Sequence, residues 1–320
     1  MGDTTTTAGA RRPGVTVVVP SWHRPEGLGR ALDGLARQSP TPPAWDVVVV
    51  ASAGDPGVAP VVEAARRRLP VAVAVVSEPR SGASAARNRG LRESAAVVAF
   101  LDDDCRPEPT WLDRITAPVL EGVCAGAGGR VVADPAVDRP RWLGDALLAY
   151  LAEYDRGPDE STLDGGDFVL TANAAFDTAV LDAVGGFDVE LGPDAGRPLV
   201  DDDVDLCRRV MATGAVIRYV PGAVVVHDLP ATRLSPAYLL RRMYAQGRSD
   251  WTLDRKSGGP RRPPASARAA LSRLGAELPG LLGQGPWHPS VALHAAGAVA
   301  RAAGYTRQSL AARPGRVTRR

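Results

Sequence analysis

Short apolar runs rich in β-branched residues alternate with helical patterns from Val15 to Leu101. The run Val15–Pro20 is continuously apolar, as expected of a parallel strand that is covered on both faces. In Leu28–Gln38 the apolar residues instead follow the spacing of one helix face. The same two patterns predict strands Asp46–Ala51, Val71–Val76 and Val97–Leu101, and helices Val58–Leu69 and Ala83–Ser94. This alternation over short connections predicts βαβ units and a doubly wound α/β fold with a mostly parallel sheet flanked by helices.

The alternation ends after a predicted helix at Thr110–Leu120, where glycine, proline and polar residues become frequent. We expect the same domain to continue to residue 230 with mixed structure. Its other elements are predicted as strands Val123–Ala133, Phe168–Ala172, Val216–Tyr219 and Ala223–Val226, and helices Leu143–Glu153, Thr178–Val184 and Val204–Thr213. Residues 1–13 lack an apolar run and are expected to form a disordered tail, so the α/β domain spans residues 14–230.

Residues 231–320 are predicted to form a helical extension that ends in a basic tail. Its helices are expected at Ser235–Ser249, Ala265–Leu282 and Ser290–Ala303. The first is amphipathic and carries Arg241 and Arg242, which leaves two interpretations. The helices pack on the α/β domain with their arginines solvated, or they make peripheral contact with an anionic membrane surface.

Composition excludes several classes of protein. The chain has 38 basic and 36 acidic residues among 320, and a net charge of +2 is unlike that of a nucleic-acid-binding domain. Its three cysteines lie far apart and form neither a zinc motif nor a disulfide framework. No apolar run is long enough to span a bilayer. We therefore expect a cytoplasmic protein without a nucleic-acid partner, at most peripheral at the inner face of the membrane.

Two acidic clusters are the main candidates for chemistry. Asp102, Asp103 and Asp104 directly follow a predicted strand, and ligands of open α/β sheets bind at the carboxyl ends of strands. Carboxylates two residues apart can share a hard divalent cation with phosphate oxygens, although a solvated turn is the simpler reading. Asp201, Asp202, Asp203 and Asp205 open the helix predicted at Val204–Thr213. Helix capping explains one or two of them, and another can act as a general base.

Two further features have both a structural and a functional interpretation. The small residues of Gly82–Asn88 open a predicted helix whose free N–H groups can hold a diphosphate, with Arg87 adding a charge. Glycine and alanine are frequent throughout the chain, so this signal is weak alone. His227 follows a predicted strand, where a structural histidine is the common case and a metal ligand the alternative.

Taken in order, four segments resemble the inverting glycosyltransferase family 2, whose members have the GT-A fold. They are VTVVVPSWHRPEGL, GASAARNRGLRESAAVVAFLDDD, LTANAAFDTAVLDAVGGFD and DDDVDLCRRVMATGAVIRYVPGAVVVH, and the resemblance covers about Val15 to Trp251. It implies a GT-A domain at residues 14–230. It also implies transfer of a sugar from a nucleotide-diphospho-sugar donor to an acceptor hydroxyl, with Mn²⁺ or Mg²⁺ as cofactor.

The resemblance implies roles for individual residues as well. The donor nucleotide would lie beside Pro20, Ser21, Arg24, Ser52, Asp55, Arg87, Asp102 and Asp103. The metal ion would be held by Asp104, Asp102 and His227. Asp203 would be the general base, and Asp202 would help to position the acceptor. The acceptor pocket would be shaped by Asn173, Gly186, Phe187 and Asp188.

One departure keeps an alternative open. Ala51 stands where this family usually has an Asp that binds the nucleobase, and Asp55 is the nearest candidate substitute. The alternative is a degenerate relative that binds a sugar nucleotide or a partner without turnover, although both acidic clusters and His227 are retained. A sugar nucleotidyltransferase would need a glycine-rich basic loop after the first strand, and a haloacid-dehalogenase-type phosphatase would need its acidic pair there. Neither pattern is present.

Overall fold

The computed structural model describes residues 14–193, 199–258 and 289–312. The predicted N-terminal tail, the helix expected at Ala265–Leu282 and the basic tail lie outside these residues. The strands are β1 Val15–Ser21, β2 Trp45–Ser52, β3 Val73–Glu78, β4 Val97–Leu101, β5 Cys105–Pro107, β6 Gly126–Pro135, β7 Ser161–Thr162, β8 Asn173–Asp177 and β9 Ile217–Leu229. The helices are α1 Pro25–Leu35, α2 Val58–Arg66, α3 Ala83–Glu93, α4 Trp111–Leu120, α5 Thr178–Ala183, α6 Asp202–Ala212, α7 Pro236–Lys256 and α9 Pro289–Ala311, with 3-10 turns η1 Asp145–Leu151 and η2 Ala231–Arg233.

The described strands form one sheet in the order β3-β2-β1-β4-β8-β6-β9-β5, with β7 beside β9. Strands β3, β2, β1 and β4 are parallel, which confirms the βαβ units expected from the sequence. The second half of the sheet is mixed, because β8 runs antiparallel to both β4 and β6 while β6 and β9 are parallel. The sheet is therefore parallel where the alternating pattern was clear and mixed beyond it.

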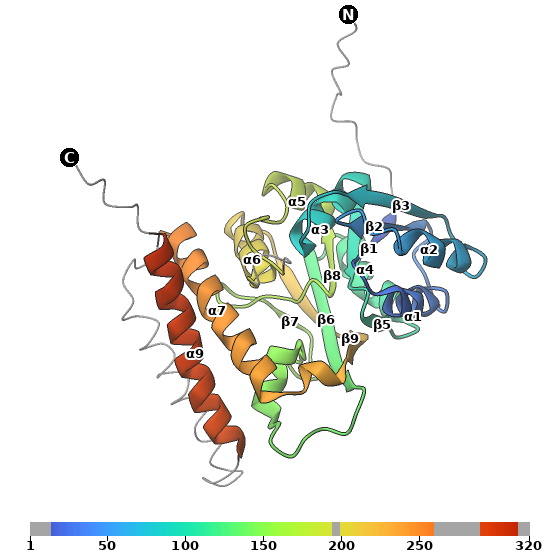
Figure 1. Ribbon diagram of the computed structural model, residues 1–320. Coiled ribbons are helices and arrows are strands. Elements are labelled where there is room, and N and C mark those ends of the chain that lie inside the picture. Colours follow the sequence, from blue (N-terminus) through green and yellow to red (C-terminus); the bar gives the residue numbers. More distant parts are fainter. Residues whose placement is uncertain (1–13, 194–198, 259–288, 313–320) are drawn as a thin grey trace, which may run out of the picture.

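Helices cover both faces of the sheet, and each face has its own apolar core (Figure 1). Alternate residues of β1 divide between them, so that Val17 and Val19 face one core and Val18 the other. The first core takes its helical residues from α1, α2 and α4, and the second from α3, α5 and α6. Strands buried on both faces explain the continuous apolar runs in the sequence.

Three predicted strands differ from the structure. Residues 168–172, expected as a strand, form an irregular segment, and the strand begins at Asn173. Thr171 does not join a strand ladder because its N–H group and hydroxyl both bond to the Asp203 carboxylate. The two strands expected at Val216–Tyr219 and Ala223–Val226 are one strand, β9, which continues through a register shift opposite Gly129 and Arg130.

The C-terminal helices α7 and α9 lie side by side along one flank of the domain (Figure 1). Their backbones approach closely, since a Cβ atom on Gly247 would lie 1.8 Å from the carbonyl oxygen of Arg301. An ion pair between Arg301 Nε and Asp250 Oδ2, at 2.6 Å, crosses the same interface. The apolar side of α7 packs against η1 through Leu239 and Met243. This packing agrees with the first of the two interpretations of the C-terminal helices.

Helix α7 also contacts the chain just before α6. Gln246 donates from Nε2 to both carboxylate oxygens of Asp201, at 2.7 and 2.6 Å, and the Val200 N–H group donates to Ser249 Oγ at 2.8 Å. No helix among the described residues combines the length and the apolar character needed to cross a membrane.

Candidate active site

The two acidic clusters meet at one edge of the sheet, although they are far apart in sequence. Arg87 on α3 joins them, with Nη2 at 2.7 Å from Asp102 Oδ1 and Nη1 at 2.8 Å from Asp202 Oδ2. Burial lowers the pKa of Arg87, but Asp102 and Asp202 outweigh it and raise the pKa above its ordinary value. Arg87 is therefore a permanently charged, buried link between the end of β4 and the start of α6.

The loop at Gly186–Asp188 packs against Arg87 and the neighbouring Asn88. The Arg87 guanidinium lies 5.6 Å from the centre of the Phe187 ring, within cation–π range. Asn88 fixes the loop, because its amide donates to the Phe187 carbonyl at 2.7 Å and accepts from the Phe187 N–H group at 2.8 Å. Gly186 has φ +69°, and a Cβ atom there would lie 2.5 Å from Asn88 Oδ1. Asp188 forms an ion pair with Lys256 of α7.

Asp203 lies beside this buried link and faces Thr171. Its Oδ1 accepts hydrogen bonds from the Thr171 hydroxyl and from the Thr171 N–H group, the latter at 3.2 Å. Burial and the neighbouring Asp202 carboxylate raise the pKa of Asp203 above its usual range, while Arg87 and Thr171 oppose the shift. A carboxylate with a raised pKa is a stronger base, which suits it to accept a proton near neutral pH.

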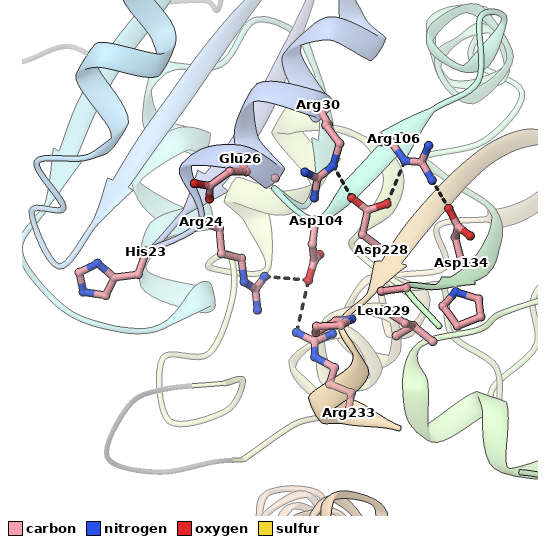
Figure 2. A pocket seen from close by; sticks show the side chains of 14 residues that line it. His23, Arg24, Glu26, Arg30, Asp104, Arg106, Asp134, Asp228, Leu229 and Arg233 are labelled. Carbon is pink, nitrogen blue, oxygen red and sulfur yellow. Dashed lines mark hydrogen bonds and ion pairs between the residues drawn. The ribbon is translucent and has the colours of Figure 1, made fainter. Parts of the chain in front are cut away.

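Asp104 and His227 lie together at the junction of β4, β5 and β9. Asp104 Oδ2 is 3.3 Å from His227 Nε2. The same oxygen is 2.8 Å from Arg24 Nη1 and 3.3 Å from Arg233 Nη2 (Figure 2). Burial alone would raise the pKa of Asp104. The hydrogen bond with His227 and the charges of Arg24 and Arg233 outweigh burial and hold that pKa well below its usual range.

The Asp104–His227 pair fits two ligands of a divalent ion. Neighbouring ligands on an octahedral ion with bonds of about 2.1 Å lie roughly 3.0 Å apart, close to the 3.3 Å between Asp104 Oδ2 and His227 Nε2. Carboxylate and imidazole are also a ligand set that Mn²⁺ accepts. Asp102 does not join them, since it pairs with Arg87, and the residues that the structure describes contain no group of three possible ligands.

The expected donor residues lie around the loop after β1. Pro20 and Ser21 are buried at the end of β1, and Asp103 turns beneath the loop. Asp103 accepts from the Trp22 N–H group at 3.2 Å and from Arg24 Nη1 at 3.0 Å. Burial raises the pKa of Asp103 to about 6, although Arg24 opposes the shift. The middle carboxylate of the triplet thus shapes the loop that the sequence predicts to hold the nucleotide.

Asp55 supports the same loop from the segment that follows β2. Its oxygens accept from the His23 N–H group at 2.6 Å and the Gly57 N–H group at 2.9 Å, and these backbone bonds lower its pKa. Asp55 therefore ties the loop after β2 to the loop after β1. Ala51 and Ser52 are both buried at the end of β2.

Asn173, which the resemblance places at the acceptor pocket, lies in the interior at the start of β8. It is fully buried, accepts from Trp111 Nε1 at 2.7 Å and donates to the carbonyl groups of Arg130 and Ala223, both at 2.8 Å. The hydrogen bonds of its side chain join α4, β6 and β9, so Asn173 stabilises the interior beneath the site. The sequence gives no sign of which face of the strand Asn173 occupies, and its role in shaping an acceptor pocket stays a prediction.

A cavity of about 560 Å³ opens beside Asp104, and sequence reasoning missed most of its lining (Figure 2). Several of its charged residues are ion-paired with one another. Arg30 lies 2.7 Å from Asp228, Arg106 lies 2.9 Å from the same carboxylate, and Arg106 also pairs with Asp134. Arg233 of η2 completes the wall next to Asp104. No motif marks these arginines, because arginine supplies nearly all the positive charge of this chain.

Several known proteins are similar to this chain. It is 28% identical over 240 residues to the succinoglycan biosynthesis protein ExoM of Rhizobium meliloti, with 73% of each sequence covered. It is 30% identical over 216 residues to the pre-mycofactocin glycosyltransferase of Mycobacterium tuberculosis. That match covers 67% of this chain but only 42% of the relative, so the chain spans less than half of that protein's length.

Solved structures agree with the fold. A mannosyltransferase from Pyrobaculum calidifontis, in complex with GDP-Man and Mn²⁺, matches with a TM-score of 0.59 and 21% identity, covering 92% of this chain and 87% of that one. This likeness supports the GT-A architecture that the sequence resemblance implies. The sequence profile described as glycosyltransferase like family 2 matches residues 13–249, a span that holds both acidic clusters, Arg87 and His227. With the motifs in their expected order on this fold, the chain belongs to glycosyltransferase like family 2.

Proposed function

We propose that the protein is a metal-dependent inverting glycosyltransferase that transfers a sugar from a nucleoside-diphosphate donor to an acceptor hydroxyl. The observation that carries the proposal is the pairing of Arg87 with Asp102 and Asp202, which brings the two acidic clusters to one site. Asp203, next to this pairing, supplies a carboxylate with a raised pKa. The relatives named above support a glycosyl donor, and a neighbour in fold binds GDP-Man.

In the proposed reaction Asp203 takes the proton from the acceptor hydroxyl. The Thr171 hydrogen bonds to Asp203 Oδ1 hold this carboxylate in one orientation. The acceptor oxygen attacks the anomeric carbon from the face opposite the diphosphate, so the configuration of that carbon inverts. Asp202, fixed by Arg87 and by Ser84, keeps the start of α6 in place during the transfer.

Asp104 and His227 would hold the divalent ion, and Asp102 would lie beside the donor ribose. When bound, Mn²⁺ or Mg²⁺ supplies charge neutralisation for the departing nucleoside diphosphate. The loop after β1, held from below by Asp103 and Asp55, would contact the nucleotide through its backbone and through Arg24. Because both Asp55 oxygens already accept backbone N–H groups, this residue would act on the base through loop shape.

The test measures release of UDP or GDP from a panel of their sugar conjugates with Mn²⁺, together with calorimetric binding of UDP and GDP. Asp203→Asn should bind nucleotide like the wild type and lose turnover. Asp205→Asn is the matched control, since Asp205 lies on the same helix and pairs with Arg209 instead. If the wild type binds nucleotide without releasing it from any sugar conjugate, the degenerate alternative is correct and the proposed reaction is wrong.

A further inference from the structure

Two guanidinium groups crowd the atoms that fit a metal ion. Arg233 reaches both members of the pair, with Nη2 at 3.3 Å from Asp104 Oδ2 and Nη1 at 3.1 Å from His227 Nε2. Arg24 approaches the same Asp104 oxygen from another side, at 2.8 Å (Figure 2). The oxygen and the nitrogen that suit a divalent ion thus face positively charged N–H groups.

These arginines and a divalent ion would compete for the same atoms. A metal ligand offers a lone pair, and Arg233 lies against both Asp104 Oδ2 and His227 Nε2. Like charges at such distances repel strongly in a site that is largely shielded from water. Loading an ion onto this pair therefore requires Arg233 to leave, and Arg24 to loosen its hold on Asp104.

Both arginines have room to move. Their side chains are 44% exposed at Arg24 and 21% exposed at Arg233, whereas the Asp104 and His227 side chains are nearly buried. Arg233 is the last residue of the short turn η2, and both arginines line the open cavity beside Asp104. A diphosphate entering with the ion would offer them new oxygen acceptors, which guanidinium groups bind well.

We propose that Arg233, assisted by Arg24, is a counter-ion switch. It closes the Asp104–His227 pair when donor is absent and turns to the donor diphosphate when nucleotide and metal bind together. The inference rests on the proposed function, because it presumes a nucleoside diphosphate and a divalent ion at this site. Its consequence is that metal alone binds weakly and that metal and nucleotide strengthen each other's binding, since a coupling between two ligands is reciprocal.

The inference predicts opposite effects of one substitution. Arg233→Met removes the competing charge and keeps an apolar side chain of similar reach. It should bind Mn²⁺ alone about tenfold more tightly, and UDP or GDP in the presence of Mn²⁺ about tenfold more weakly, the usual scale of one charge-assisted hydrogen bond. A residue that only stabilises the fold would weaken both. A residue that only binds phosphate would leave the affinity for Mn²⁺ alone unchanged.

The experiment titrates Mn²⁺ by electron paramagnetic resonance, with and without saturating UDP or GDP, on the full chain. Arg30→Met is the matched control, because Arg30 lines the same cavity but pairs with Asp228, and it should change neither affinity. If Arg233→Met does not fold, Arg24→Met tests the same inference. It should also bind Mn²⁺ alone more tightly and nucleotide with Mn²⁺ more weakly.

The outcomes separate the two proposals. If the wild type binds neither UDP nor GDP with Mn²⁺, the proposed function fails, and the switch fails with it. If the wild type binds them but Arg233→Met leaves binding of Mn²⁺ alone unchanged or weaker, only the counter-ion switch is wrong. The switch is supported if Arg233→Met binds Mn²⁺ alone more tightly and nucleotide with Mn²⁺ more weakly, while Arg30→Met changes neither affinity.

Discussion

Asp201 is a half-buried acid whose charge costs stability, and the cost can be worked out from its surroundings. Burial raises its pKa from 3.8 to about 6, with Gln246 opposing the shift and Asp250 adding to it. Asp201 also has a left-handed backbone, with φ 75°, a conformation that asparagine adopts readily. Asp201→Asn is therefore a substitution that the backbone accepts and that keeps an oxygen for the Gln246 amide.

The sign of the effect follows from proton binding. Folded protein keeps the Asp201 proton up to about pH 6, whereas the unfolded chain releases it near 3.8. Between these values the folded state binds more protons, so stability falls as pH rises and stays lower above pH 6. A difference of about two pKa units corresponds to about 3 kcal/mol. Asp201→Asn should recover about this much at pH 8 and almost nothing at pH 4.

Thermal unfolding of both proteins from pH 4 to pH 8 measures this. The melting temperature of Asp201→Asn should exceed that of the wild type by about 5 °C at pH 8, and the gap should close toward pH 4. Asp145→Asn is the control, because the Asp145 side chain is 82% exposed and its substitution should give a difference that is flat with pH. A flat difference for Asp201→Asn, or one that grows at low pH, would refute the reasoning.

Four other substitutions test the site and its support. Asp203→Asn should lower turnover by about 10²–10⁴-fold at unchanged nucleotide affinity, and in the wild type the raised pKa of Asp203 should make turnover fall as pH drops below neutral. Arg87→Met leaves two carboxylates without their buried partner and should cost about 3–5 kcal/mol in denaturant unfolding. Gly247→Val sets a side chain against the Arg301 carbonyl and should make α9 more accessible to limited proteolysis. Trp111→Phe should cost about 1–3 kcal/mol in the same unfolding assay. The substitution removes the indole N–H group that donates to Asn173 Oδ1 and leaves that buried amide oxygen without this donor.

The sequence predicts the first half of the fold well because strands buried on both faces leave continuous apolar runs. It fails at residues 168–172, where Thr171 bonds to Asp203 rather than to a neighbouring strand, since a contact between distant segments has no local signal. The sequence identifies Asp102, Asp103 and Asp104 as a candidate site, but it does not indicate which partner each carboxylate faces. Asp102 turns to Arg87 on α3, whereas Asp104 turns to Arg24 and to Arg233 on η2.

Arg233 shows a second limit. It is one basic residue among 38, in a stretch without a recognised motif, and only the fold brings it to Asp104 and His227. The roles of Asp102, Asp104, Asp203 and His227 remain predictions from the resemblance, and the geometry described above supports them to different degrees.

The close packing of α7 and α9 bears on how the protein should be shortened for crystallisation or fused to other proteins. The family profile ends at residue 249, in the middle of α7, which runs from Pro236 to Lys256. A chain cut there would lose Asp250, the partner of Arg301, and Lys256, the partner of Asp188. It would also leave Gln246 and Ser249, which hold the residues before α6, on a frayed helix end. A boundary after Ala311 keeps both helices and their contacts intact, whereas a boundary at the end of the family profile would divide α7.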